Sequence, residues 1–556
     1  MEGNTGEEGP RILVSRGPAG PSQTVNLPLM QDRPTQPRQL YFIGVATALA
    51  LALLGGFPLG ILAALGATRD IGLGARWSPI VQTHGHLQLV GFVSLFIVGV
   101  AYQVLPRFKQ TPLASYRLGL ASIVLLASGA ALRAASQPWA DSPPIGLLFV
   151  TSACLELAGA AAFATVATRT IRAGQRVVFD YYFLAAATWI VAASAANLAI
   201  VQEMARDGTT VVASSRNAPL LDMYLLGFIT TFILGVSIRV LPHFLSLRPA
   251  RSRLLLPALA LFTAGLAVRI GAGWIDAYSD WSRPDWLNAT GIYAMAAAVV
   301  LFVFALGIFR SSARHEGDII GSHEKLIRTA YVWLFVAFAI EAWYATKIIA
   351  SDFRPDFLEN GAARHALALG FMTQMIMGVG SRALPTFAGK RLYSARLATI
   401  GWLLINVSAV MRVGHAAVPW GSVAFRFDHI AAAGVLGLLA VIVFGFNIWR
   451  SINPPRPHHT SEPSPDPVKG EPPPEQPFRL TSASIVADVL ANVPGSLDLL
   501  ITYGFRPLAD PEMRTRVAAH VTLAAAAGMQ GINVDNLIND LAALQARHTP
   551  EALRLR

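Results

Sequence analysis

Residues 91–108 read GFVSLFIVGVAYQVLPRF, and the pattern recurs as GFITTFILGVSIRVLPHF at residues 227–244 and as GFMTQMIMGVGSRALPTF at residues 370–387. Each copy is an apolar run that ends in Leu-Pro-x-Phe. The second copy begins 136 residues after the first, and the third begins 143 residues after the second. The helices predicted to follow end at Arg133, Arg269 and Arg412, which keep the same offsets. Several landmarks at two shared offsets predict three copies of one four-helix unit.

The composition is that of a membrane protein. Of the 556 residues, 53% are hydrophobic and only 14% are charged, and the mean hydropathy is +0.48. A soluble protein rarely has that balance. Apolar runs of about 20 residues recur between Leu40 and Arg450, and each is long enough to cross a hydrocarbon core of roughly 30 Å. We therefore expect an all-α polytopic membrane protein with about twelve transmembrane helices.

The formal net charge of +11 reflects membrane topology rather than nucleic-acid binding, because Lys and Arg cluster at the ends of the predicted helices. Alternate loops are richer in these residues, and the basic loops begin at Arg107, Arg169, Arg248, Arg310 and Lys390. The bias predicts that both termini are cytoplasmic. We expect a multi-pass protein of the bacterial inner membrane, surrounded by lipid and without a nucleic-acid partner.

The composition changes along the chain in a way that predicts four parts. Residues 1–38 form a polar, Pro-rich cytoplasmic tail expected to be disordered, and they lack the pattern of a signal peptide. The membrane domain covers residues 39–450, with repeats at about 39–170, 178–310 and 325–450. A Pro-rich linker follows at residues 451–477. Helix start and stop signals then predict a small soluble helical domain at residues 478–548.

The histidines are the candidate metal ligands, because the single cysteine, Cys154, excludes an internal disulfide and any cysteine-ligated cluster. Five of the twelve histidines are predicted at one extracytoplasmic level of the membrane. They lie at the start of the second helix, the start of the tenth, the end of the eleventh and the start of the twelfth: His84, His86, His365, His415 and His429. Ionisable residues inside a bilayer are costly and often mark function.

His86 and His365 occupy the same place in the first and third repeats, five residues before the Gly-Phe pair, where the second repeat has Asp222. Two histidines at one depth on different helices can ligate a haem from both sides. We therefore predict a haem, of type b, between His86 and His365. His84 lies about 200° around the helix from His86. It faces either a second cofactor or only a neighbouring helix.

Three arginines and three acids complete the set of candidate site residues. Arg133, Arg269 and Arg412 reach the predicted depth of the haem, where a guanidinium can bind a propionate. Each could instead anchor its helix at the interface. The intramembrane acids Glu156, Glu341 and Asp222 could relay protons, or could be neutral and hydrogen-bonded.

These residues carry a resemblance to a known family. The run His84-Gly-His86-Leu-Gln-Leu leading into Val104-Leu-Pro-Arg-Phe, with His365 on the tenth helix, resembles the NnrS proteins and, more distantly, haem-copper oxidase subunit I. The resemblance covers roughly residues 40–450. It implies twelve helices in three arcs and low-spin haem ligands at His86 and His365. It also implies haem and copper, and relief of nitric oxide stress in denitrifying bacteria.

The chain departs from the oxidase pattern, in which helix ten carries paired histidines and helices six and seven carry three copper ligands. Here the His-x-His lies on the second helix. His415 and His429 could instead supply a copper or second haem site. The C-terminal part resembles, through Ile485-x-x-x-Val-Leu, Gly504-Phe and Thr522-Leu, a small helical domain of unknown function found beside iron–sulfur repair and hybrid-cluster proteins.

The leading interpretation is a membrane haem protein involved in nitric oxide metabolism or nitric oxide stress relief, supplied by an unknown electron donor. One alternative is a nitric oxide or oxygen reductase of the haem-copper type, which would make the protein an oxidoreductase. A second alternative is a solute or metal transporter without haem. A Soret band in the purified protein separates the first two interpretations from the third.

Overall fold

The structure is a computed structural model, and it describes residues 36–279, 285–310, 321–351, 353, 355–417, 421–453, 478–511, 514, 518, 521–530 and 532–547. The chain divides into two compact units, residues 1–456 and 457–556, which we describe separately. Most of the predicted N-terminal tail and of the predicted linker lies outside the described residues.

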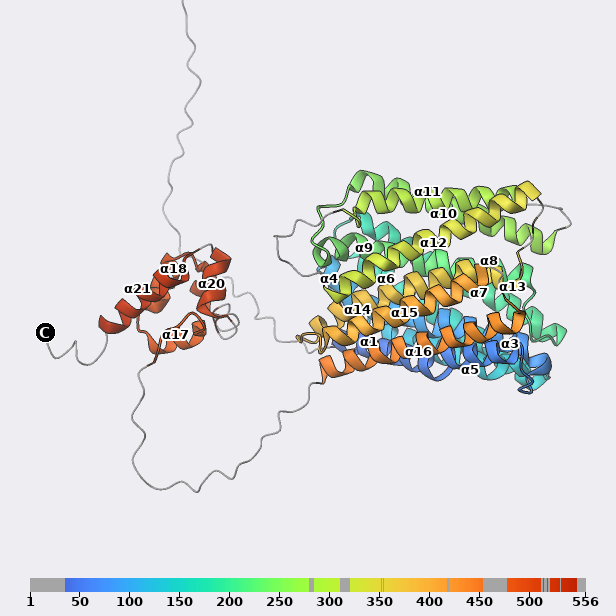
Figure 1. Cartoon of the computed structure of the whole chain (residues 1–556), viewed down its shortest axis with the longest axis horizontal. Coiled ribbons are helices and arrows are strands. Elements are labelled where there is room, and N and C mark those ends of the chain that lie inside the picture. The colour runs from blue at the N-terminus through green and yellow to red at the C-terminus, as the bar shows by residue number, and fades with distance from the viewer. Residues whose placement is uncertain are drawn as a thin grey trace, which may run out of the picture. The chain divides into compact units, whose positions relative to one another are not determined.

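The membrane unit is a bundle of long helical segments (Figure 1). Several segments consist of consecutive elements that continue one another. In chain order the described elements are α1 (Gln36–Leu51), η1 (Ala52–Gly56), α2 (Phe57–Gly66), η2 (Gly74–Arg76), α3 (Trp77–His86), η3 (Leu87–Ser94), α4 (Leu95–Lys109), α5 (Tyr116–Ser136), η4 (Gln137–Trp139), α6 (Pro143–Arg172), α7 (Val178–Asp207), α8 (Ser214–Asp222), η5 (Met223–Thr230), α9 (Thr231–Phe244), α10 (Ser252–Tyr278), α11 (Asp285–Leu306), α12 (Ser322–Ser351), α13 (Phe357–His365), η6 (Ala366–Thr373), α14 (Gln374–Phe387), α15 (Ala395–Ala417) and α16 (Val423–Ile452).

Eleven of the described helical segments are long and apolar enough to cross a membrane. A further segment, residues 357–387, is equally continuous but more polar, because Arg364, His365 and Gln374 lie within it. The expected all-α polytopic fold is therefore confirmed, with eleven clear spans and one polar segment in place of the predicted twelve apolar ones.

Three wide π-helical turns occur at corresponding places in the bundle. Elements η3, η5 and η6 each span eight residues and begin directly after His86, Asp222 and His365. A π-helix inserts an extra residue per turn and is frequent at functional sites. The three elements recur at the offsets of 136 and 143 residues that the repeated motif shows. The threefold repeat stays a prediction, which this coincidence supports.

Glycines inside these wide turns allow close packing of bulky side chains. An added Cβ at Gly227 would lie 2.7 Å from the indole of Trp189, and one at Gly370 would lie 2.5 Å from the indole of Trp333. The glycine of the repeated Gly-Phe pair is therefore a packing requirement. In the second and third repeats it lets the helix pack closely against the preceding helix.

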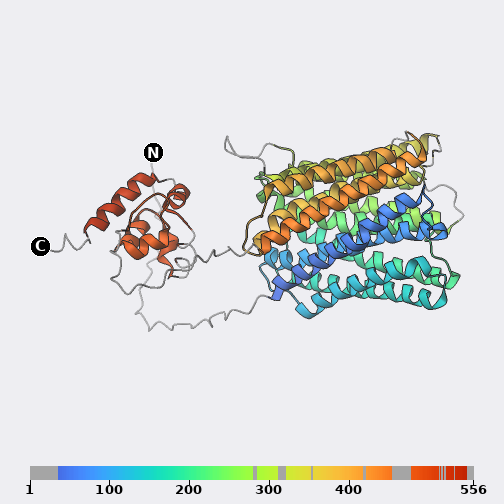
Figure 2. The ribbon, with the colours of Figure 1, turned by 60° about the horizontal axis from the view of Figure 1, so that its bottom comes forward.

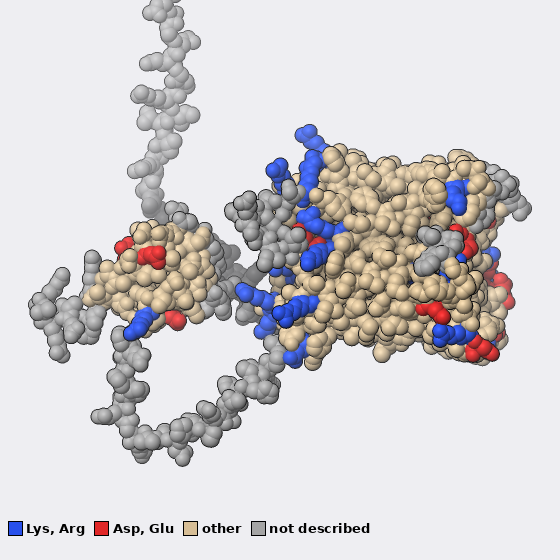
Figure 3. Space-filling view, viewed as in Figure 1, with Lys and Arg blue, Asp and Glu red and all other residues tan. Residues whose placement is uncertain are grey.

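The bundle closes on itself, because the first and last helices lie side by side (Figure 2). Helix α2 packs against both α3 and α16, and α6 packs against α7 as α11 packs against α12. Lys and Arg gather at one end of the bundle, and most of the visible Asp and Glu lie at the other end (Figure 3). Helices α3 and α13 begin at the second, more acidic end.

The predicted starts of the second and tenth helices are wrong by about two turns. Helix α3 begins at Trp77 and α13 begins at Phe357, so His84, His86 and His365 lie near the ends of these two elements. Likewise α16 begins at Val423, upstream of His429. The histidines of α3 and α13 therefore lie deeper in the bundle than expected.

The C-terminal unit contains short helices around a core of its own. Its described elements are α17 (Val486–Asn492), α18 (Ser496–Thr502), η7 (Arg506–Ala509), α20 (Leu523–Gln530) and α21 (Val534–Arg547). An isolated bridge joins Ile485 to Thr522. Val489, Leu500 and Leu541 are fully buried in the core, as expected for a small helical domain.

Candidate cofactor site

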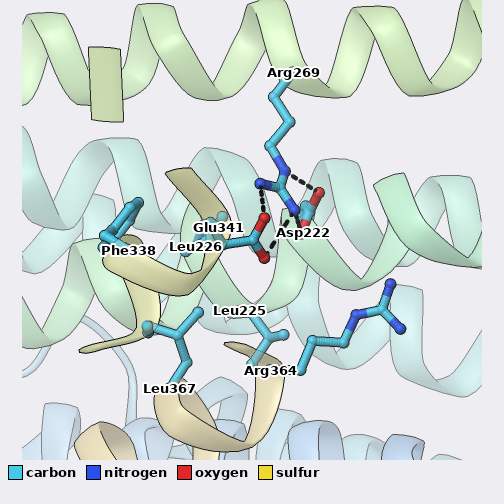
Figure 4. A pocket seen from close by; sticks show the side chains of 9 residues that line it. Asp222, Leu225, Leu226, Arg269, Phe338, Glu341, Arg364 and Leu367 are labelled. Carbon is cyan, nitrogen blue, oxygen red and sulfur yellow. Dashed lines mark hydrogen bonds and ion pairs between the residues drawn. The ribbon is translucent and has the colours of Figure 1, made fainter. Parts of the chain in front are cut away.

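Arg269 lies in a buried cluster of charged side chains from α8, α10 and α12 (Figure 4). Its Nε donates to Asp222 Oδ2 at 2.6 Å, and its Nη1 donates to Glu341 Oε2 at 2.8 Å. Arg364 of α13 lines the same cavity, which has a volume of about 10 Å³ and room for about one water molecule. The guanidinium of Arg269 is thus balanced by two carboxylates of the protein.

His86 belongs to a second buried network, between α3, α6 and α7. Its Nε2 and Glu156 Oε1 are 2.7 Å apart, and the other carboxylate oxygen of Glu156 accepts a hydrogen bond from Asn197 at 3.1 Å. Arg133 donates to Asn197 Oδ1 at 2.6 Å and to Gln137 at 3.0 Å. The Nε2 of His86 is therefore already engaged by a carboxylate.

His84 and His365 have a different environment from His86. His84 Nδ1 lies 2.7 Å from the carbonyl oxygen of Gly56, and His365 Nδ1 lies 2.8 Å from that of Gly361. Among the described residues, neither Nε2 has a hydrogen-bond partner. A metal-ligating histidine commonly donates its second N–H to a backbone carbonyl, which fixes the tautomer and the ring. The rings of His84 and His365 are therefore oriented in the way that is common for metal-ligating histidines.

The two histidines share their surroundings with Arg412 of α15. His84 and His365 lie within electrostatic range of each other, and Arg412 acts on both. The Nη1 of Arg412 is buried and has no hydrogen-bond partner within the described part of the chain. An added Cβ at Gly361 would lie 2.9 Å from Arg412 Nη2. Arg412 thus lies directly against the backbone that precedes His365.

The three arginines at corresponding positions differ in what neutralises them. Arg269 is paired with two carboxylates, and Arg133 is linked to Glu156 through Asn197. For Arg412, no such acid is found among the described residues. Because a buried charge without a partner is costly, this third site would be stabilised by an anionic group such as a carboxylate.

Gly60 creates the space in which the His84 ring lies, and Gly56 creates the space for the side chain of Gln88. An added Cβ at Gly60 would lie 2.5 Å from His84 Cε1, and one at Gly56 would lie 3.0 Å from the side chain of Gln88. Sequence reasoning missed these glycines, as it missed Asn197 and Gly361. The small residues Gly56 and Gly60, four apart in an apolar helix, were the available signal, because such spacing permits close helix approach.

His415 and His429 lie together, away from any third histidine that the structure describes. Their ring centroids are 4.5 Å apart, and Phe425 lies 4.0 Å from His429. His429 Nδ1 contacts the backbone oxygen of Phe425 at 2.9 Å. Among the described residues, no group of three or more His, Cys, Asp or Glu side chains is placed to hold a metal ion.

The acids predicted as proton relays are all held by partners: Glu156 by His86 and Asn197, and Asp222 and Glu341 by Arg269. Their role in proton transfer stays a prediction. The spacing of His84 and His86 predicts that they face different neighbours, and they do, because one contacts η1 and the other contacts α6.

Comparison with known proteins gives two family matches and a structural likeness. The family described as NnrS protein matches residues 37–456, and a domain of unknown function, DUF1858, matches residues 480–538. A haem-copper terminal oxidase, solved as a dimer by cryo-electron microscopy, has a similar fold. The TM-score is 0.56 at 11% identity, over 91% of this chain and 99% of that one. The curated proteins gave no match.

Proposed function

The chain belongs to the NnrS family, and from this premise we propose that it is a membrane haem protein whose haem, of type b, lies between α3 and α13. His84 and His365 are its axial ligands, and Arg412 binds a propionate. This changes the sequence-based assignment at one position, because His84 replaces His86 as the partner of His365.

One observation supports this proposal above all: the imidazole rings of His84 and His365 are hydrogen-bonded in the same way. Both His84 and His365 bond a backbone carbonyl through Nδ1, which leaves Nε2 for iron. The Nε2 of His86 is instead 2.7 Å from a carboxylate oxygen of Glu156. Iron ligation by His86 through Nε2 would require breaking this buried, charge-assisted contact, whereas His84 and His365 offer Nε2 without such a cost.

The residues present fit a haem in charge as well as in ligand type. Arg412 offers a buried guanidinium nitrogen without a partner in the described part of the chain, and a propionate is a carboxylate that a guanidinium can bind in a fork. The glycine at position 60 leaves room for the His84 ring. When bound, the haem would supply one-electron redox chemistry.

We further propose that this haem serves nitric oxide metabolism or stress relief in the inner membrane of a bacterium, with both termini cytoplasmic. Two axial imidazoles leave no open position on the iron. Nitric oxide would therefore bind at such a haem only if His84 or His365 gave up its place as a ligand. We expect slow, incomplete formation of a nitric oxide complex in the resting protein.

Copper is a separate part of the proposal. His415 and His429 are close enough, with ring centroids 4.5 Å apart, to share one ion. Imidazole suits copper, and copper heads the affinity order of the common divalent metals. Two imidazoles form a less complete site than the haem site, so we expect weak binding there.

Purified protein tests the function directly. We expect a Soret band and a pyridine haemochrome of type b, with one haem per chain. Consumption of nitric oxide that depends on an added electron donor would identify an enzyme, whereas stoichiometric uptake would identify a protective binding protein. Colourless protein from cells with abundant haem would contradict the proposal and would favour the transporter alternative.

A further inference from the structure

An aromatic pair joins the two helices that carry the proposed haem ligands. Trp77 is the first residue of α3 and Phe357 is the first residue of α13. Their ring centroids are 5.6 Å apart, with an interplanar angle of 56°. Trp77 Nε1 donates to the carbonyl oxygen of Ala63 at 2.8 Å, which fixes the indole against α2.

The pair lies between the surface and the proposed haem. Trp77 precedes His84 by seven residues and Phe357 precedes His365 by eight, which correspond to about 10 Å and 12 Å along a helix axis. The first distance is measured along α3, which carries His84, and the second along α13, which carries His365. The two rings therefore form an aromatic contact between the more acidic end of the bundle and the proposed haem.

Phe357 is exposed and lies beside polar residues. Its exposed fraction is 55%, and the residues beside it in the first turn are polar, with Asp356 exposed and forming a capping box with Glu359. Trp residues at a membrane boundary often serve only as anchors. Trp77 differs from such an anchor, because its N–H bonds α2 and its ring packs on Phe357.

Acidic side chains lie beside the exposed ring of Phe357. No cation is paired with Asp356 or Glu359 among the described residues. The two described arginines that shortly precede Trp77 are paired within the chain, Arg69 with Asp428 at 2.8 Å and Arg76 with Asp141 at 3.1 Å. An exposed aromatic centre with a charged rim is the usual anatomy of a protein docking site.

We propose that this surface, the Trp77–Phe357 face, docks a soluble, lysine-rich electron-donor protein. The donor passes one electron to the haem through the aromatic pair: its metal centre is oxidised by one electron, the ferric haem becomes ferrous, and no bond or proton is exchanged. The proposal rests on the proposed function, because it requires a haem between His84 and His365. It commits to a protein donor rather than to a membrane quinol.

Two variants and one matched control test the face. Phe357→Ala removes the exposed ring, and Asp356→Ser removes a rim charge while a serine keeps the helix cap. The control is Trp286→Ala, because Trp286 is 56% exposed and lies next to an acid in the first turn of α11, away from the ligand helices. Reduced mitochondrial cytochrome c, a basic one-electron protein, serves as the probe.

Stopped-flow reduction of the haem and binding of the probe to protein in nanodiscs are measured together. We expect Phe357→Ala to lower the second-order rate constant and the affinity about tenfold, as loss of an interface anchor does. Asp356→Ser should weaken the salt dependence of the rate, and Trp286→Ala should change neither quantity. Equal rates and affinities for Phe357→Ala and Trp286→Ala would overturn the proposal, as would reduction by a quinol alone.

Reduction by dithionite keeps this test separate from the proposed function. If the dithionite-reduced spectrum of Phe357→Ala equals that of the wild type while docking is unchanged, the haem proposal stands and the docking face is refuted. If the wild type itself shows no haem spectrum, the proposed function fails first. Probe binding remains measurable in that case and decides about the face by itself.

Discussion

Replacement of Gly60 by alanine tests the position of His84 by a steric effect alone. The added Cβ would lie 2.5 Å from Cε1 of the His84 ring, whereas ordinary carbon–carbon contacts begin at about 3.5 Å. The ring must therefore retreat by roughly 1 Å. It cannot do so freely, because its Nδ1 is 2.7 Å from the carbonyl oxygen of Gly56.

The expected cost follows from this overlap. Overpacking of this kind costs about 1–3 kcal/mol, which corresponds to a loss of about 5- to 150-fold in an equilibrium constant. If His84 is an axial ligand, the loss falls on haem binding and on the low-spin state. We expect Gly60→Ala to be purified with less haem and with a raised fraction of high-spin iron.

The matched control is Gly85→Ala, on the helix that carries His84. An added Cβ at Gly85 meets nothing within 4 Å, so this variant should keep the haem content and spectrum of the wild type. Haem per chain from the pyridine haemochrome, the Soret position and the electron paramagnetic resonance spectrum provide the comparison. Identical haem content and spin state in Gly60→Ala, Gly85→Ala and wild type would refute the assignment of His84 as a ligand.

Three further perturbations address other parts of the molecule. Arg269→Leu leaves two buried carboxylates without their partner, which costs about 3–5 kcal/mol, so thermal unfolding in detergent should occur at a clearly lower temperature; an unchanged midpoint would show that the cluster contributes little. In a background without the native cysteine, Ser142→Cys should be labelled from outside the cell and Ser322→Cys should not, and the reverse labelling would invert the topology. His429→Ala should abolish weak copper binding measured by metal analysis and leave the Soret band intact, whereas tightly held copper in this variant would place the site elsewhere.

The sequence predicts the bundle well, because the physical signals of membrane helices are local. Apolar runs identify the spans, and the repeated Leu-Pro-x-Phe aligns segments that the structure places in similar helices. The starts of the helices were harder to predict. Residues 77–86 and 357–365 are polar and lack apolar periodicity, yet they form α3 and α13, and one side of each packs in the bundle through residues such as Ile80 and Leu358.

The choice between His84 and His86 could not be predicted from spacing. It depends on Glu156, which lies 70 positions along the chain from His86 and occupies its Nε2. It also depends on Gly60, which leaves room for the His84 ring, and on the carbonyl oxygen of Gly56, which its Nδ1 contacts. Such contacts arise from tertiary packing, and no local pattern encodes them.

The arginines show the same limit. Repeat position predicts that Arg133, Arg269 and Arg412 share a depth but not which of them has a partner. Arg269 meets Asp222 and Glu341 from two different helices, and the combination appears only after folding. We therefore expect Arg412, rather than Arg133 or Arg269, to bind a propionate, because its buried Nη1 has no hydrogen-bond partner in the described part of the chain.

The most direct test is an experimental density map of the purified red protein. The account predicts a flat macrocycle whose iron is bound by Nε2 of His84 and Nε2 of His365, with a propionate at Arg412. It also predicts that His86 stays bonded to Glu156. A map in which His86 ligates the iron, or in which no haem lies between α3 and α13, would contradict the central claim.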